Sequence, residues 1–479
     1  MTEQARSQGS RVNHQLATEV KQVPVGYKQT EVGVIPEDWG IVCMREIVKD
    51  HRLPSGIYKD KRLYSTGTKI IKLGDVFNFD EFRPECAQRV QLSENEIRAY
   101  SVEVDDIFLA LASVKLEGVG KVMLVKELDE PTAYDHNVAL IRVTAAMQSD
   151  YLAYLFKSAY VRKLVAQNAT QVGTSFLKAS TILGFALPLP STKEQTAIAN
   201  ALSDVDALIS ELEKLIAKKK AIKTATMQQL LTGRTRLPQF ALRDDGTPTN
   251  SSGTNLDSGT GGPKGEGHDG LRKGTKPSEL GEIPADWEVV TLGDLVEICS
   301  GDSPSKFQFL TDGVPYFKVE QLNNGSVYAD ETPYYIQTSR VVRAGSIIFP
   351  KRGASILSNK IRVLKRDSFM DTNLMTLTCS SEMDEFYLHN QLLYRGLDSV
   401  ADTTSIPQIN NKHIYPYLIP FTVKEEQTAI ATILSDMDAE IQALEQRLGK
   451  TRQIKQGMMQ ELLTGKTRLI KPSKEVIHE

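Results

Sequence analysis

The chain has 479 residues, of which 41% are hydrophobic and 24% are charged, and its net charge is −3. This composition is that of a folded protein and excludes collagen-like and wholly disordered chains, and the length predicts roughly three or four folding units. No apolar run approaches the roughly 18–20 residues that a membrane helix needs, and the polar start lacks a secretory signal, so we expect a cytoplasmic protein without a membrane partner.

The first half of the chain opens with a box of sequence that the second half repeats. Residues 1–25 are polar, lack a clear period and are expected to form a flexible tail. Gly26–Trp39 (GYKQTEVGVIPEDW) then recurs as Gly274–Trp287 (GTKPSELGEIPADW), at an offset of 248. A repeat at a fixed offset predicts two copies of one structural unit.

Each box is followed by a region with both strand and helix patterns. Short apolar stretches between turn residues predict strands over 69–73, 106–110, 138–143 and 346–349. Apolar positions at helical spacing predict helices over 150–164 and 383–395. We therefore expect one mixed α+β globule over 26–192 and another over 274–424.

A long helix is predicted after each globule, over 193–237 and 425–469. These two segments align without a gap at an offset of 232 and are identical at 26 of 45 positions. Their apolar residues are spaced by alternating steps of four and three, which is a heptad seam. The seam residues are Ile198, Leu202, Val205, Ile209, Leu212 and Ile216 in the first copy and Ile430, Leu434, Met437, Ile441, Leu444 and Leu448 in the second.

Acidic residues at the start of each segment and a Thr-Gly pair at its end predict helices of about 38 residues. Two such seams are best buried by pairing the helices; the alternative is that each helix packs only on its own globule. Residues 238–273 are rich in glycine and polar residues and are expected to be a flexible linker, and 470–479 a C-terminal tail.

Positive charge is concentrated in two stretches. Residues 340–366 contain eight Lys and Arg and no Asp or Glu, and residues 57–72 have a net charge of +4. Because lysine and arginine that neutralise phosphates release counterions, both stretches are candidates for contact with a polyanion; a solvated surface is the alternative. The candidate residues are Lys351, Arg352, Lys360 and Arg362 in the first stretch and Lys59 and Arg62 in the second.

Other basic residues lie at the ends of the long helices. Lys218, Lys219, Lys220 and Lys223 are expected to complement the negative end of the first helix. Four more follow the two Thr-Gly pairs, and the sequence does not decide whether they contact DNA or a partner subunit: Arg234, Arg236, Lys466 and Arg468.

Motifs of catalysis and cofactor binding are missing from the sequence. Gly465-Lys466-Thr467 resembles the end of a phosphate-binding loop, but Gln460 stands where that loop needs glycine. No G-x-G-x-x-G follows a strand, no G-x-S-x-G is present, and the seven histidines show no i, i+4 pair. The four cysteines form no C-x-x-C pair and are expected to be buried free thiols. The sequence favours a binding protein.

The sequence resembles the specificity subunit (HsdS) of type I restriction-modification enzymes. The likeness covers roughly residues 26–469 and rests on the E-Q-T-A-I-A start and L-L-T-G-[RK]-T-R-L close of both helical segments and on the two I-P-x-D-W boxes. It implies an α+β fold with two mixed target recognition domains, separated by two long helices in an antiparallel coiled coil, and an internal pseudo-two-fold repeat.

The resemblance also implies the function and the partners. A specificity subunit is non-catalytic and binds double-stranded DNA; each domain reads one half of an asymmetric bipartite target, and the coiled coil sets the spacer. It joins two modification subunits, which hold S-adenosylmethionine, and two restriction subunits, which use ATP and Mg²⁺. No cofactor is expected in this chain itself.

Two strands of the family pattern can be placed on this sequence. Residues 68–75 and 314–321 resemble a strand that delivers a basic residue near DNA, which makes Lys72 and Lys318 equivalent candidates. Residues 104–110 and 344–350 resemble a G-D-I-L strand, with Asp105 in the first copy where the second has Gly345. The alternative function is a non-DNA scaffold with two protein-binding globules on a helical spacer, and the clustered charge argues against it.

Overall fold

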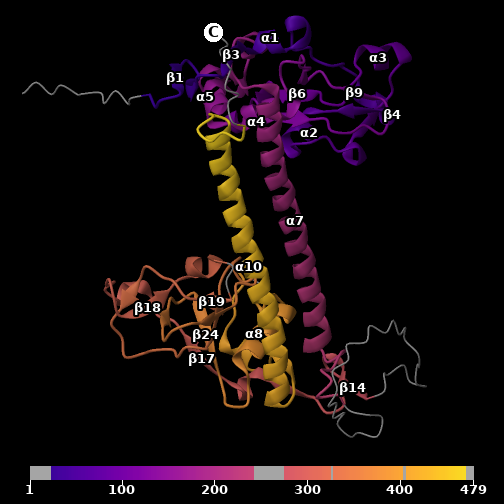
Figure 1. Ribbon diagram of the computed structural model, residues 1–479. Helices are drawn as coiled ribbons and strands as arrows, with labels where there is room; N and C mark the ends of the chain where they lie inside the picture. Colours follow the sequence, from indigo (N-terminus) through magenta and orange to yellow (C-terminus); the bar gives the residue numbers. More distant parts are fainter. Residues whose placement is uncertain (1–22, 242–273, 325–326, 403–405, 471–479) are drawn as a thin grey trace, which may run out of the picture. The chain divides into compact units, whose positions relative to one another are not determined.

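The computed structural model describes residues 23–241, 274–324, 327–402 and 406–470. Most of the predicted tails and linker, 1–25, 238–273 and 470–479, lies outside the described residues. The chain divides into two compact units: unit 1 contains residues up to Ser210 together with those from Gly449 onward, and unit 2 contains Glu211–Leu448. Both long helices, α7 (Thr192–Leu231) and α10 (Lys424–Leu462), contribute to both units (Figure 1).

Unit 1 begins with a hairpin and continues as a mixed globule whose first and last strands pair with each other. These are β3 (Gly40–Cys43) and β13 (Ala186–Leu189), which run antiparallel. The hairpin is β1 (Tyr27–Thr30) and β2 (Gly33–Pro36), and the other strands form three sheets, in the orders β10-β6-β8, β5-β4-β9 and β11-β12-β7. Their bounds are β4 Tyr64–Ile71, β5 Gln88–Val90, β6 Ile107–Ala110, β7 Ala112–Ser113, β8 Val122–Leu124, β9 Thr132–Tyr134, β10 Val138–Ile141, β11 Thr170–Val172 and β12 Thr174–Phe176.

Two helices of unit 1, α2 and α4, contact the sheet β10-β6-β8. The helix predicted over 150–164 is wrong in one respect, because it is two helices, α4 (Ser149–Lys157) and α5 (Ala159–Asn168). Ser158 separates them, and its side chain caps α5 by accepting the Val161 N–H. The shorter helices are α1 Met44–Ile47, α2 Leu73–Asn78, α3 Glu94–Ala99 and α6 Ala179–Ile182.

Unit 2 repeats the frame of unit 1 around a different interior. A hairpin of β14 (Thr275–Ser278) and β15 (Gly281–Pro284) comes first, and β16 (Glu288–Thr291) pairs antiparallel with β25 (Leu418–Phe421). The interior has a five-stranded sheet, β17-β24-β21-β22-β19, and a three-stranded one, β20-β18-β23. The bounds are β17 Val296–Ser300, β18 Val314–Phe317, β19 Tyr328–Ala329, β20 Tyr335–Ile336, β21 Ile347–Pro350, β22 Arg362–Leu364, β23 Phe369–Met370, β24 Leu374–Cys379, α8 Glu385–Arg395 and α9 Asn411–Ile414.

The heptad seams are covered in both long helices, and all twelve predicted seam residues are buried or half-buried. In unit 2, Lys223 pairs with Asp438 and Lys220 with Glu445, so the residue numbers run in opposite directions along the two helices. In unit 1, Lys455 likewise pairs with Asp206. The helices therefore form an antiparallel pair within each unit, which confirms the predicted coiled coil.

The lysines near the end of α7 have a role that the helix-end argument missed. Lys219, Lys220 and Lys223 each form an ion pair with an acidic side chain of α10, at 2.6, 2.6 and 2.5 Å. They hold the partner helix rather than only complementing a helix dipole.

Each long helix ends at the glycine that the sequence predicts. Gly233 and Gly465 have φ of +66° and +69°, and each donates its N–H group to the carbonyl three residues earlier, as the C′ glycine of a Schellman motif does. A Cβ atom on either glycine would also lie 2.4–2.5 Å from a proline of a box. Glycine is therefore required at both positions for two reasons: its positive φ, and the proline that leaves no room for a side chain.

The boxes contact the helix ends through a group of side chains that we call the clasp. In unit 1 the Glu194 carboxylate accepts hydrogen bonds from Trp39 Nε1 at 3.0 Å and from the Arg468 guanidinium at 2.5 and 2.8 Å. Arg468 also binds both carboxylate oxygens of Asp38 at 2.8 Å. The hydrogen bond from Arg468 lowers the pKa of Asp38.

Unit 2 contains the same clasp with equivalent residues. Glu426 accepts from Trp287 Nε1 at 2.9 Å and from Arg236 at 2.6 and 2.9 Å, and Arg236 also binds Asp286. The box of each half therefore closes on the helix end of the other half. Arg236 and Arg468, which the sequence left open between DNA and a partner subunit, are occupied inside the chain.

Candidate nucleic-acid interface

In unit 1 the candidate Lys72 lies where two parallel strands end. It follows β4, which pairs in parallel with β9, and its N–H donates to Asp75 Oδ2 at 2.7 Å. Its ammonium lies 4.4 Å from the centroid of the Tyr64 ring, a cation–π distance. The Tyr64 hydroxyl in turn donates to the buried carboxylate of Asp135, which directly follows β9.

Lys318 occupies the same place in unit 2. It follows β18, which pairs in parallel with β23, and its N–H donates to a side chain three residues on, Gln321 Oε1, at 2.9 Å. Its ammonium lies 3.6 Å from the centroid of the Tyr334 ring. Lys72 and Lys318, expected to be equivalent from the strand pattern, are equivalent in position.

A short turn next to each lysine also recurs, and sequence reasoning missed it. Asp135 and Asp371 each accept the N–H of the asparagine two residues on, Asn137 at 2.9 Å and Asn373 at 2.6 Å. A glycine packs closely at each turn: a Cβ on Gly56 would lie 1.9 Å from the carbonyl oxygen of Tyr134, directly before the first turn, and one on Gly301 2.1 Å from that of Asp371. The available signals were the repeated D-x-N and S-G pairs.

The basic run of residues 340–366 is divided by a hairpin. β21 and β22 pair antiparallel, so the start and end of the run lie at one end of the two strands and its middle at the other. At the first end the basic groups are engaged: Arg340 with Asp302, Lys365 with Asp330, and Arg343 and Arg366 with backbone carbonyls. The other end, which we call the basic end, consists of Lys351, Arg352, Lys360 and Arg362.

The basic end adjoins the turn of unit 2. The Lys351 N–H donates to the Asn373 carbonyl at 2.8 Å, and its ammonium donates to Ser300 Oγ at 2.8 Å. Burial, and then the charge of Arg352, lowers the pKa of Lys351, and burial lowers the pKa of Arg362. Within the described part of the chain, Arg352 and Lys360 have no ion pair and are the basic end's available cations.

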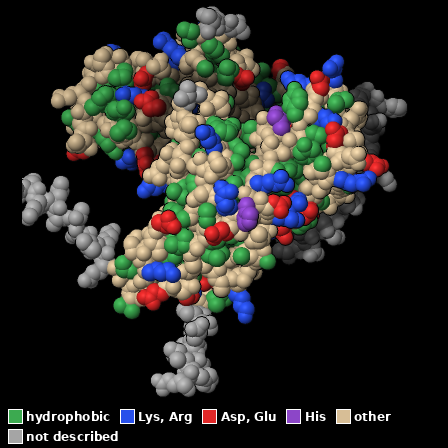
Figure 2. All heavy atoms as spheres, turned by 90° about the horizontal axis from the view of Figure 1, so that it is seen from above, with side chains coloured by type: hydrophobic (Ala, Val, Ile, Leu, Met, Phe, Trp, Pro, Cys, Tyr) green, Lys and Arg blue, Asp and Glu red, His purple; other side chains and the backbone are tan. Residues whose placement is uncertain are grey.

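The candidates Lys59 and Arg62 of the basic stretch 57–72 are neutralised locally. Lys59 pairs with Glu96 at 2.6 Å, and Arg62 pairs with Asp60 at 2.9 Å. Hydrogen bonds from Lys59 and Arg62 lower the pKa values of Glu96 and Asp60. On the face that Figure 2 shows, lysine and arginine side chains are likewise interspersed with acidic ones. Lys72, also in the stretch 57–72, forms no ion pair with a described residue; its ammonium contacts the Tyr64 ring and Gln88 Oε1.

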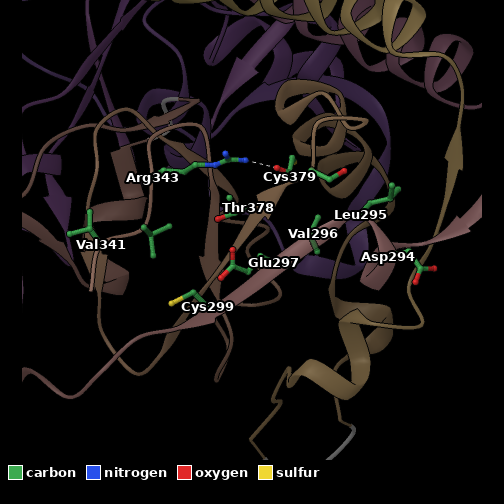
Figure 3. Close-up of a pocket in the computed structure, with 11 residues that line it drawn as sticks. Asp294, Leu295, Val296, Glu297, Cys299, Val341, Arg343, Thr378 and Cys379 are labelled. Atoms are coloured by element: carbon green, nitrogen blue, oxygen red, sulfur yellow. Dashed lines mark hydrogen bonds between the residues drawn. The ribbon is translucent and has the colours of Figure 1, made fainter. Parts of the chain in front are cut away.

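Unit 2 contains a cavity of about 460 Å³. It lies along β17 and β24, and Figure 3 shows the Arg343 guanidinium directed at the Cys379 carbonyl, with Glu297 and Cys299 on the neighbouring strand. Among the described residues no three His, Cys, Asp or Glu side chains are grouped to hold a metal, and no helix is long and apolar enough to cross a membrane.

The four cysteines are free, as expected, but their predicted burial is wrong for three of them. Cys379 is buried, and its burial raises the pKa of the thiol to about 12. Cys43 and Cys299 are half-buried and Cys86 is exposed.

Replacing Arg352 and Lys360 together with alanine is expected to weaken DNA binding to all sequences alike and to reduce the slope of log affinity against log salt by about two, because each phosphate contact contributes roughly 0.9. Fluorescence anisotropy with a DNA duplex over a salt series measures both. Replacing Arg340 and Lys365, at the engaged end, is the matched control and should leave the slope unchanged. Equal slopes in all three proteins would remove the basic end from the interface.

Comparison with known proteins identifies this combination of units. The family profile described as "Type I restriction modification DNA specificity domain" matches residues 36–224 and 284–456. The specificity subunit of the type I restriction enzyme MjaX of Methanocaldococcus jannaschii is 25% identical over 92% of this chain and 97% of its own length. That of MjaIX from the same organism is 24% identical over 81% and 85%.

A solved structure agrees in fold. The S subunit of a type I restriction-modification system from M. genitalium matches 88% of this chain and 96% of its own, with a TM-score of 0.53 at 15% identity. The two family matches fall on the two halves that carry the boxes and the clasps, and the family and the names of the relatives confirm a non-catalytic specificity subunit. The chain belongs to the family of type I restriction-modification DNA specificity subunits.

Proposed function

We propose that each unit of this chain reads one half of an asymmetric, interrupted DNA target and that the paired α7 and α10 helices set the distance between the halves. The proposal rests on one observation: the two units share the same recurring elements but have different internal sheets. Both units have the same hairpin, clasp, lysine and D-x-N turn, whereas their sheets differ in number and order of strands. Units that bind in one way but present different surfaces are suited to read two different sequences.

The antiparallel helix pair supports the proposed geometry of reading. An internal repeat whose two copies are joined by antiparallel helices suits two half-sites on opposite strands of a duplex. Lys72 and Lys318 would then make equivalent backbone contacts, and the basic end would add phosphate contacts on the side of unit 2. Arg362 and Lys351 would contribute less than Arg352, because both are half-buried.

We further propose that this chain has the partners of a type I system. The chain would join two modification subunits, which carry S-adenosylmethionine, and two restriction subunits, which use ATP and Mg²⁺. Within this proposal Arg236 and Arg468 stabilise the chain rather than bind a partner, since each already binds two carboxylates.

Single-molecule sequencing of methylated adenines tests the proposal in a host that lacks other adenine methyltransferases and expresses this chain with its modification partner. We expect one interrupted motif whose two parts differ. A host with no new methylated motif, together with no shift of DNA by the purified complex, would favour the scaffold function instead.

A further inference from the structure

Two exposed aromatic side chains stand next to the lysine and the turn of unit 1. Tyr58 is 72% exposed, and the His136 side chain is 38% exposed. Their rings meet edge to face, with centroids 4.9 Å apart. His136 is the middle residue of the D-x-N turn, so the pair is part of the recurring frame described above.

The backbone beneath this pair is held rigidly. The Ile57 N–H donates to the Tyr134 carbonyl at 2.9 Å, and the His136 N–H donates to the Ile57 carbonyl at 3.2 Å. Gly56 makes the close approach to the turn that allows both bonds. Side chains fixed on such a base can present defined contacts without a large loss of conformational entropy.

A chain of contacts joins the aromatic pair to Lys72. His136 Nδ1 lies 3.1 Å from Asp135 Oδ1, and the other oxygen of that carboxylate accepts the hydroxyl of Tyr64. Lys72 in turn lies over the Tyr64 ring. A phosphate held by Lys72 would therefore place the adjoining nucleotides beside Tyr58 and His136.

Unit 2 has different side chains at the same two places. The Asp302 N–H donates to the Met370 carbonyl at 3.1 Å, as Ile57 does to Tyr134, so Ser303 corresponds to Tyr58. Thr372 is the middle residue of the second turn and corresponds to His136. The frame is constant, while an aromatic pair in one unit is replaced by two hydroxyl side chains in the other.

We propose that Tyr58 and His136 contact base edges and determine part of the half-site read by unit 1. The proposal rests on the proposed function and names the residues that carry its specificity. The tyrosine hydroxyl and the imidazole nitrogens can donate to or accept from base edges, and both rings offer an apolar face or edge to a thymine methyl. Ser303 and Thr372, with neither ring, would favour different bases in unit 2.

The test uses the full chain with its modification partner and sequencing of methylated adenines. Tyr58→Ala and His136→Ala should each relax one or two positions in one half-site, with roughly a 10-fold loss of discrimination there, and leave the other half-site and the gap unchanged. Tyr58→Phe separates the hydroxyl from the ring. Val104→Ala is the matched control and should change nothing. Val104 is an exposed apolar residue that precedes β6, whereas the other end of β6, at Ala110, pairs with Val138 beside the turn.

Three outcomes would overturn the inference. Both half-sites could stay intact in the two alanine variants while the wild type methylates a bipartite motif, in which case the pair reads no bases although the proposed function holds. Methylation could fall at all sites with an unchanged motif, which would indicate a contact with a partner protein. Relaxation of both half-sites would indicate a general structural effect. Failure of the wild type to methylate any bipartite motif would instead contradict the proposed function itself.

Discussion

Replacing Arg468 with alanine is expected to lower the free energy of unfolding of unit 1 by about 3–5 kcal/mol, because it leaves a buried carboxylate without its partner. Glu194 is almost fully buried, and besides Arg468 its carboxylate accepts the Trp39 N–H. Arg236→Ala should have the same effect on unit 2 through Glu426. Lysine should not rescue either site, since it cannot bind two carboxylates in a planar, bidentate way.

The chain provides its own probes for this measurement. Its two tryptophans, Trp39 and Trp287, lie one in each clasp, so urea denaturation followed by fluorescence in single-tryptophan variants reports on each unit separately. Arg234→Ala, at an exposed arginine two residues before Arg236, is the matched control and should change stability by less than about 0.5 kcal/mol. If Arg236→Ala and Arg234→Ala, both in unit 2, unfold at the same urea concentration, the clasp does not stabilise that unit.

A subunit in which residues 40–189 replace residues 288–421 is expected to direct methylation to a symmetric motif, two inverted copies of the half-site of unit 1. The splice points lie at the ends of equivalent strand pairs, where Gly40 is paired with Leu189 and Glu288 with Phe421. The helix residues that meet the graft are nearly the same in both units, because Ile198, Ala199 and Leu202 correspond to Ile430, Ala431 and Leu434. The graft should therefore fold on its new helices.

Sequencing of methylated adenines reads the result directly. The reciprocal graft, with residues 288–421 in place of 40–189, is the control and should give two inverted copies of the other half-site. A grafted subunit that is folded and active but still methylates the original asymmetric motif would show that the interiors do not determine the target.

The long helices were predictable because their signal is local and written twice. Steps of four and three along Ile198–Ile216, and the Thr-Gly pairs at 232–233 and 464–465, follow from helix geometry alone. Which helix end meets which box was not predictable, since Arg236 and Arg468 are equally compatible with either box. Which box each arginine contacts depends on tertiary packing, because the end of each long helix packs on the other globule.

The similarity of the two interiors was not visible in the sequence, because different residues adopt the same backbone conformation in the two copies. Asp105 stands where the second copy has Gly345, yet both have positive φ, +71° and +83°. Aspartate tolerates this left-handed conformation better than most residues, so the turn is kept although the sequence differs. The D-x-N turns keep Asp and Asn in both copies and differ only in their middle residues, His136 and Thr372.

Charge counting identified the basic run but could not show which of its members are available. Lys59 and Glu96 are distant in sequence and meet only in the fold, and Arg340 finds Asp302 in the same way. Antiparallel pairing of β21 with β22 then divides the remaining charges between two ends. The net charge of a stretch of sequence therefore predicts a basic surface only when the carboxylates that pair with its lysines and arginines are known.

Lengthening both long helices by one heptad tests most directly whether they set the distance between two half-sites. The insertions belong after Ser210 in α7 and after Leu448 in α10, where seven residues preserve the seam. Seven residues add about 10.5 Å, or roughly three base pairs at about 3.4 Å each. We predict that sequencing of methylated adenines will show the same two half-sites with a gap about three base pairs longer. Altered half-site letters, or an unchanged gap in an active complex, would contradict the account.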